Sequence, residues 1–109
     1  MKAKKLSFSI RQVAQMVGYS IAWVRLREND GSFRTDENVA ILPDRTKLNS
    51  DYAYGQRRYD LSQIEQMMKS AHQRLRITDL RYAIVSRIID SYREIESLKE
   101  KKEWHYNSQ

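Results

Sequence analysis

The sequence predicts a mainly helical protein with a small β-hairpin and a long C-terminal helix. The chain of 109 residues contains only three glycines and one proline, so few residues interrupt helices. Hydrophobic residues recur at helical spacing through most of the sequence, and this period disappears only between Gly31 and Gly55. A chain of this length builds one core, so we expect one small domain with an additional helix.

Two short helices are predicted near the N-terminus. Ser9 and Gln12 have the spacing of a capping box, and the apolar positions that follow end at Gly18, a natural helix stop. Ser20 then caps a second helix that ends before Gly31. The residues expected to face the core are Ile10, Val13, Ala14, Val17, Ile21, Val24 and Leu26. Two short helices joined by a glycine-containing turn form a helix-turn-helix pattern.

A hairpin and a third helix should follow. The β-prone run 39–42 and the strand QRRY (56–59) predict a β-hairpin with a long tip. Asp60 and Gln63 repeat the capping pattern and begin a helix. Its core-facing residues are expected to be Leu61, Ile64, Met67 and Met68.

The last predicted helix begins after Thr78 and runs from Asp79 to about Lys102. Its heptad-like apolar residues, interrupted by Ser91, are Leu80, Ile84, Ile88, Ile95 and Leu98. A helix packed on its own domain would carry nearly the same stripe. At 1.5 Å per residue, however, this helix would be about 35 Å long, more than so small a domain covers. A protruding helix that pairs with a second copy is the favoured interpretation.

The distribution of charge indicates a nucleic-acid partner. The chain has 20 Lys and Arg against 14 Asp and Glu, a net charge of +6. Residues 1–27 contain no acid and hold the bases Lys2, Lys4, Lys5, Arg11, Arg25 and Arg27. There is no cysteine, and the two histidines are isolated, so we expect no disulfide, metal site or cofactor. No apolar run is long enough for a signal peptide or membrane span, and a cytoplasmic location is expected.

Candidate DNA contacts lie on the second helix and the hairpin. The second helix of a helix-turn-helix enters the major groove, which makes Ser20, Ala22, Trp23, Arg25 and Arg27 the candidates there. Arg25 can donate to a guanine edge or a phosphate, whereas Trp23 can equally be a core aromatic. Further candidates for backbone contacts are Arg11, Arg45, Lys47, Tyr54, Gln56, Arg57, Arg58 and Tyr59. Because Arg57 and Arg58 point to opposite faces of a strand, one of them can be a structural residue.

Three segments resemble one known family in the expected order. SIRQVAQMVG (9–18), GYSIAWVRLRENDG (18–31) and GQRRYDLSQIEQM (55–67) resemble the MerR-like winged helix-turn-helix regulators. The resemblance implies base and phosphate contacts from the second helix and the wing. It also implies dimerisation through the C-terminal helix. This sequence departs from the family in carrying Leu26 and Arg27 where members usually have aromatic residues, and in a longer connection into the wing.

The sequence therefore predicts a DNA-binding domain (1–76), a C-terminal dimerisation helix (77–104) and a disordered tail (105–109). We expect a dimer that binds two half-sites of double-stranded DNA and regulates transcription, associated with a nucleoid or plasmid. A plasmid-partition or excisionase-type role would use the same surface. A helix-mediated protein-interaction adaptor is a further alternative. No phosphate loop or metalloprotease motif occurs, and enzyme activity is not expected.

Overall fold

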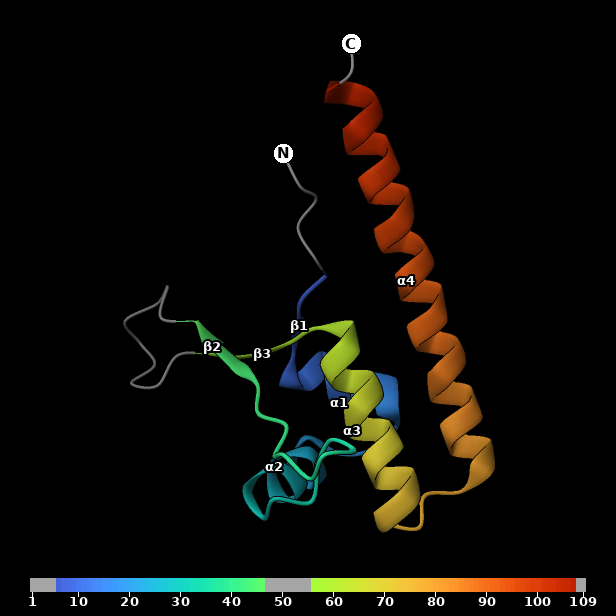
Figure 1. Ribbon diagram of the computed structural model, residues 1–109. Coiled ribbons are helices and arrows are strands. Elements are labelled where there is room, and N and C mark those ends of the chain that lie inside the picture. The colour runs from blue at the N-terminus through green and yellow to red at the C-terminus, as the bar shows by residue number, and fades with distance from the viewer. Residues whose placement is uncertain (1–5, 47–55, 108–109) are drawn as a thin grey trace.

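The computed structural model describes residues 6–46 and 56–107 and is mainly helical with a small antiparallel sheet (Figure 1). The elements in chain order are β1 (Phe8–Ser9), α1 (Ile10–Val17), α2 (Ile21–Asn29), β2 (Asp44–Thr46), β3 (Gln56–Tyr59), α3 (Leu61–Arg74) and α4 (Asp79–Asn107). The helices and the returning strand of the hairpin lie where the sequence predicts them.

The two predicted N-terminal helices are present as α1 and α2, joined by a short turn. The Ser9 hydroxyl accepts a hydrogen bond from the Gln12 backbone, and the Gln12 side chain accepts one from the Ser9 backbone, which completes the capping box. Gly18 ends α1 in the left-handed conformation, with φ of 79°. The Ser20 hydroxyl then accepts from the Trp23 backbone and starts α2.

The sheet has the strand order β1-β3-β2, with β3 in the centre. In the antiparallel registers, Phe8 pairs with Tyr59 and Arg45 pairs with Arg57. QRRY is thus the returning strand, as predicted. The prediction of a strand at residues 39–42 is wrong, because only an isolated bridge between Arg34 and Ala40 forms there.

The misplaced strand has a physical explanation. Asn38 adopts a left-handed φ of 64°, which turns the chain immediately before the β-prone run. Val39 and Leu42 are exposed, so their β propensity is not supported by packing on a sheet face. Pro43 then offers no backbone N–H for a ladder. The strand that pairs with β3 begins one residue later, at Asp44.

One core joins all the helices to the sheet. Asp60 and Gln63 form the predicted capping box at the start of α3, which packs alongside α4 (Figure 1). From α4, Val85 and Ile89 are almost fully buried, and the Tyr92 ring meets the Phe8 ring edge-on at 5.1 Å between centroids. The other buried apolar residues include Val13, Val17, Val24, Phe33, Tyr59, Ile64, Met68 and Ala71.

Helix α4 is longer than predicted and buries a different stripe. It continues to Asn107, past the expected end near Lys102 and into the expected tail from His105, since no glycine or proline interrupts it. Its C-terminal part extends beyond the other elements (Figure 1). The heptad-like residues Leu80, Ile84, Ile95 and Leu98 are exposed, and Ile88 is partly buried against the core. Apart from Ile88, the apolar stripe is therefore not used to bury the domain's own core.

The first turn of α4 contacts the turn between α1 and α2. The Arg81 guanidinium lies above the Tyr19 ring, 5.8 Å from its centroid. A Cβ atom placed on Gly18 would lie only 2.3 Å from Arg81 Nη1. Helix α4 and the turn between α1 and α2 are thus in direct contact at a position where only glycine fits without movement.

Candidate nucleic-acid interface

Helix α2 presents one exposed face. Ala22, Arg25, Leu26 and Asn29 recur at the spacing of a single helix face, and all of them are exposed. None of their side chains makes a hydrogen bond or ion pair within the described part of the chain. This surface is free to contact a partner, as the sequence predicts for Ala22 and Arg25.

The prediction that Leu26 belongs to the core is wrong. Its side chain is 56% exposed, whereas Val24 is completely buried. Two residues along a helix correspond to about 200°, so Val24 and Leu26 must point in nearly opposite directions. The buried position one turn after Val24 is occupied by Glu28 instead.

Trp23 packs toward the protein. Its ring stacks on Tyr19 with centroids 4.3 Å apart and meets Phe33 edge-on at 5.8 Å. The side chain is half-buried and borders the core. This packing matches the core-aromatic interpretation of Trp23.

Glu28 connects α2 to the central strand. It is the only acid in α2 and is 8% exposed. One carboxylate oxygen lies 3.0 Å from Arg57 Nη1, and the other accepts a hydrogen bond from the Tyr59 hydroxyl. The prediction that Tyr59 contacts DNA is wrong, because its side chain is 1% exposed and its hydroxyl is bonded to Glu28. Burial, together with the hydrogen bond to Glu28, raises the pKa of Tyr59, so the phenol keeps the proton that it donates. Arg57 is thus the member of the arginine pair that packs against the helices.

Glu28 is not among the site residues predicted from the sequence, although its position in the sequence indicates a special role. Glu28 lies four residues after Val24 and seven after Ile21, on the apolar stripe of α2. A charged residue in such a position must find a partner when it is buried. The sequence does not reveal that this partner lies in the wing strand, 29 residues further along at Arg57.

Arg58 points to the opposite side of β3. Its Nε donates to the Ser7 hydroxyl at 2.9 Å, and its Nη2 donates to the Ser7 carbonyl oxygen at 2.8 Å. These bonds hold β3 against the segment that enters β1. The two arginines lie on alternating faces, as expected for a strand, and both also make contacts within the protein.

The remaining candidates on the helices occupy different environments. Arg11 is exposed on α1. The Ser20 hydroxyl serves as the helix cap, and Arg27 forms an ion pair with Asp30 at 3.3 Å. The pKa of Asp30 is lowered, first by the Ser32 hydroxyl that donates to it and also by Arg27. Arg27 is therefore engaged at the end of α2.

The remaining wing candidates can be placed only in part. Arg45 lies in β2 opposite Arg57, and Gln56 begins β3 opposite Thr46, as the backbone pairing shows. Lys47 and Tyr54 lie outside the described residues. The structure therefore places the central strand β3 next to α2, through the ion pair between Arg57 and Glu28.

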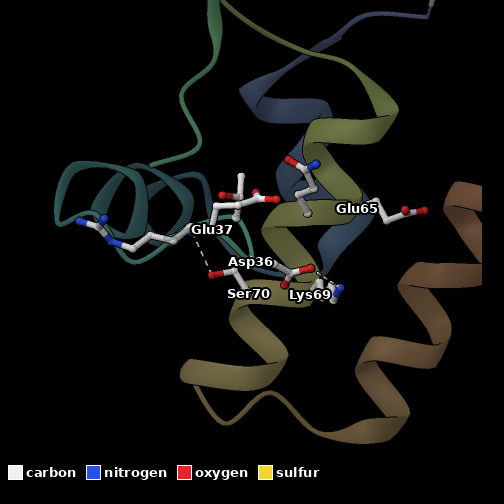
Figure 2. Close-up of a pocket in the computed structure, with 8 residues that line it drawn as sticks. Asp36, Glu37, Glu65, Lys69 and Ser70 are labelled. Atoms are coloured by element: carbon white, nitrogen blue, oxygen red, sulfur yellow. Dashed lines mark hydrogen bonds and ion pairs between the residues drawn. The ribbon is translucent and has the colours of Figure 1, made fainter. Parts of the chain in front are cut away.

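A polar pocket lies away from this surface, between the loop after α2 and helix α3 (Figure 2). It has a volume of about 250 Å³ and is bordered by Asp36, Glu37, Glu65 and Lys69. Figure 2 shows Asp36 and Lys69 turned toward one another, and their charged atoms are 2.9 Å apart. Glu65 forms an ion pair with Arg93 on α4. The pairing of these charges is typical of a contact that holds a loop against a helix.

The described part of the chain consists of residues 6–46 and 56–107. Among them, no group of three or more His, Cys, Asp or Glu side chains is arranged to hold a metal ion. No helix there combines the length and apolar character needed to cross a membrane. Comparison with known proteins found no matching family model, curated protein or solved structure.

Proposed function

We propose that this chain is a dimeric, sequence-specific DNA-binding protein that acts as a transcriptional regulator. The observation that carries the proposal is the exposed face of α2, which contains Arg25 and no acid, in a helix tied to the wing strand by Glu28. This arrangement fits insertion of α2 into a major groove with the wing against the adjacent backbone. The resemblance of the sequence to MerR-like winged helices supports the same surface.

The electrostatics of α2 favour a polyanion. Glu28, its only acid, is buried between Arg57 and Tyr59 and contributes little negative field at the exposed face. Arg25 projects from that face, and Arg11 is exposed on the preceding helix. A duplex carries a phosphate charge every few ångströms, so exposed arginines gain affinity by releasing its counterions.

Dimerisation through α4 would join two copies of the DNA-binding surface in one molecule. The exposed apolar residues Leu80, Ile84, Ile95 and Leu98 supply a stripe that a second α4 can cover. Two recognition helices tied together in this way would bind half-sites about one helical turn, or a multiple of it, apart.

Other roles share these features. Plasmid partition and excision would use the same DNA surface. The exposed stripe on α4 also favours a second candidate function, a protein-interaction adaptor. The dependence on salt distinguishes DNA binding from an adaptor function. DNA binding through several arginines and lysines weakens steeply as the salt concentration rises, while apolar helix pairing does not.

The proposed function is tested by selecting binding sites for the full chain from random duplexes and then measuring variants on the selected site. Arg25→Ala should relax preference at one base pair and weaken binding about tenfold or more, the effect of one lost bidentate base contact. Lys47→Ala should weaken binding to all DNA sequences alike. It should also reduce the steepness of log affinity against log salt concentration by about one. Arg74→Ala, an exposed arginine at the end of α3, is the matched control. Equal affinity in the parent, Arg25→Ala and Lys47→Ala would contradict the proposed surface.

A further inference from the structure

The exposed face of α2 combines an apolar centre with polar neighbours. Leu26 is 56% exposed, although leucine is among the residues most often buried. Ala22 lies one turn before it on the same face, and both residues are exposed. Arg25 and Asn29 border this pair. An apolar pair of this size, bordered by a cation and an amide, can contact a small apolar group that lies among polar ones.

We infer that Leu26, with Ala22, contacts the 5-methyl group of a thymine in the major groove and so makes this protein prefer a thymine at one position of its site. The inference rests on the proposed DNA-binding function. The thymine methyl is the apolar group that base pairs present in the major groove, and apolar side chains contact it directly. Arg25 would be placed beside this thymine to donate to a guanine or a phosphate.

The geometry of α2 supports this role for the pair. Ala22 is a small residue in the first turn of the helix, and its short side chain lets the backbone approach the base edges. Leu26, one turn later, reaches further from the helix axis. The two side chains together form a short apolar strip about one helical turn, or roughly 5 Å, long. A single methyl group fits such a strip better than an extended protein surface does.

The surroundings favour DNA over an apolar protein partner. On α4 the large exposed apolar residues recur as a stripe, whereas Leu26 is the only large apolar residue on the exposed face of α2, a helix that lies wholly within the described residues. Its neighbours carry positive charge or an amide, and the one acid of the helix is turned inward against Arg57. This charge pattern complements a duplex with phosphates on both sides of the groove.

Replacement of thymine by uracil in the selected site tests the inference, since it removes only the methyl group and preserves base pairing. With the parent protein, one thymine of each half-site should show a loss of affinity of about fourfold, the equivalent of about 0.8 kcal/mol for one methyl group. In Leu26→Ala, binding to thymine and uracil should become equal at that position. Leu26→Met, which keeps an apolar side chain of similar reach, should retain the preference.

Val39→Ala is the matched control, because Val39 is 60% exposed but lies outside α2, and this variant should keep the parent's preference for thymine. If a site is selected but the protein binds it equally well with uracil in place of any thymine, the inference is wrong and the proposed DNA-binding function is unaffected. Failure to enrich any site would overturn both. A preference that persists in Leu26→Ala would assign the contact to another residue and likewise refute the inference.

Discussion

At the scale of single residues, Glu28 has the largest influence on the site without belonging to its exposed surface. Its carboxylate forms an ion pair with Arg57 and accepts a hydrogen bond from the Tyr59 hydroxyl. Three charged or polar groups are therefore shielded from water together. Such a group is stabilising only while every member has its partner. This carboxylate therefore adds a polar link between α2 and β3 to the apolar packing of Val24 and Trp23.

Removal of the carboxylate should be costly. Glu28→Ala leaves the Arg57 guanidinium, whose side chain is only 18% exposed, without its counter-ion, and the free energy of unfolding should fall by about 3 kcal/mol. Urea unfolding followed by circular dichroism measures the change. Glu37→Ala removes an exposed carboxylate and should change stability by less than about 0.5 kcal/mol. Similar stabilities in the two variants would show that the buried group is not needed to hold α2 to β3.

Tyr59 should give the protein a dependence on alkaline pH. Its pKa is raised in the folded state, so the stability that it contributes is complete below the unfolded pKa of about 10 and is lost as pH rises above that value. Between about pH 9 and about pH 11, the parent should lose about 1 kcal/mol more unfolding free energy than Tyr59→Phe. The comparison uses urea unfolding at each pH. Parallel losses in both proteins would contradict a buried, protonated phenol.

At the scale of elements, the turn between α1 and α2 is fixed by conformation and by contact. Gly18 has φ of 79°, and Arg81 from α4 occupies the space where a side chain would stand. Gly31 has a similar φ of 75°, but its nearest neighbour, Arg34 Nη2, would be 3.3 Å from an added Cβ. The two glycines thus share a left-handed backbone, which would strain any other residue, but differ in crowding.

Comparison of the two glycines separates these effects. Gly31→Ala should cost about 1 kcal/mol from the left-handed backbone alone. Gly18→Ala should cost about 0.5–1 kcal/mol more, because Arg81 must leave Tyr19. In an Arg81→Ala background the difference between the two substitutions should vanish in thermal unfolding. A difference that persists would show that crowding by Arg81 is not its cause.

Elements with local signals were predictable, and those that depend on distant partners were not. The two capping boxes, at Ser9 and Asp60, use residues three positions apart, so the starts of α1 and α3 follow directly from the sequence. The strand predicted at residues 39–42 does not form there, because pairing with β3 and not β propensity decides which residues become β2. Leu26 was assigned to the core because the sequence does not show that Glu28 takes the buried position.

At the scale of the whole molecule, α4 provides both a core face and an unpaired face. Val85 and Ile89 pack into the domain, while Leu80, Ile84, Ile95 and Leu98 are exposed along the same helix. At 1.5 Å per residue its 29 residues extend about 43 Å, close to the 50 Å longest dimension of the molecule. The sequence predicts a long helix with this stripe, although one that ends earlier than α4 does, and the division between the two faces follows only from packing against α1, α3 and Phe8.

The proposed dimer should be measurable through the exposed stripe. The parent should sediment as a dimer at micromolar concentration, and the double variant Ile84→Lys and Leu98→Lys should sediment as a monomer, because it places like charges in an apolar contact. Val39→Lys, exposed outside α4, serves as the control and should remain dimeric. A monomeric parent would exclude this mode of pairing.

The two faces of α2 are under separate constraints. Val24 and Glu28 are held by the core and the wing, while Ala22, Arg25, Leu26 and Asn29 make no side-chain hydrogen bond or ion pair within the described chain. Inherited changes at the exposed positions can therefore accumulate without loss of folding, and a combinatorial library randomised only there should yield mostly soluble, folded proteins. A substitution at one of these four exposed positions should therefore change what α2 can contact without changing how the helix is held in the fold.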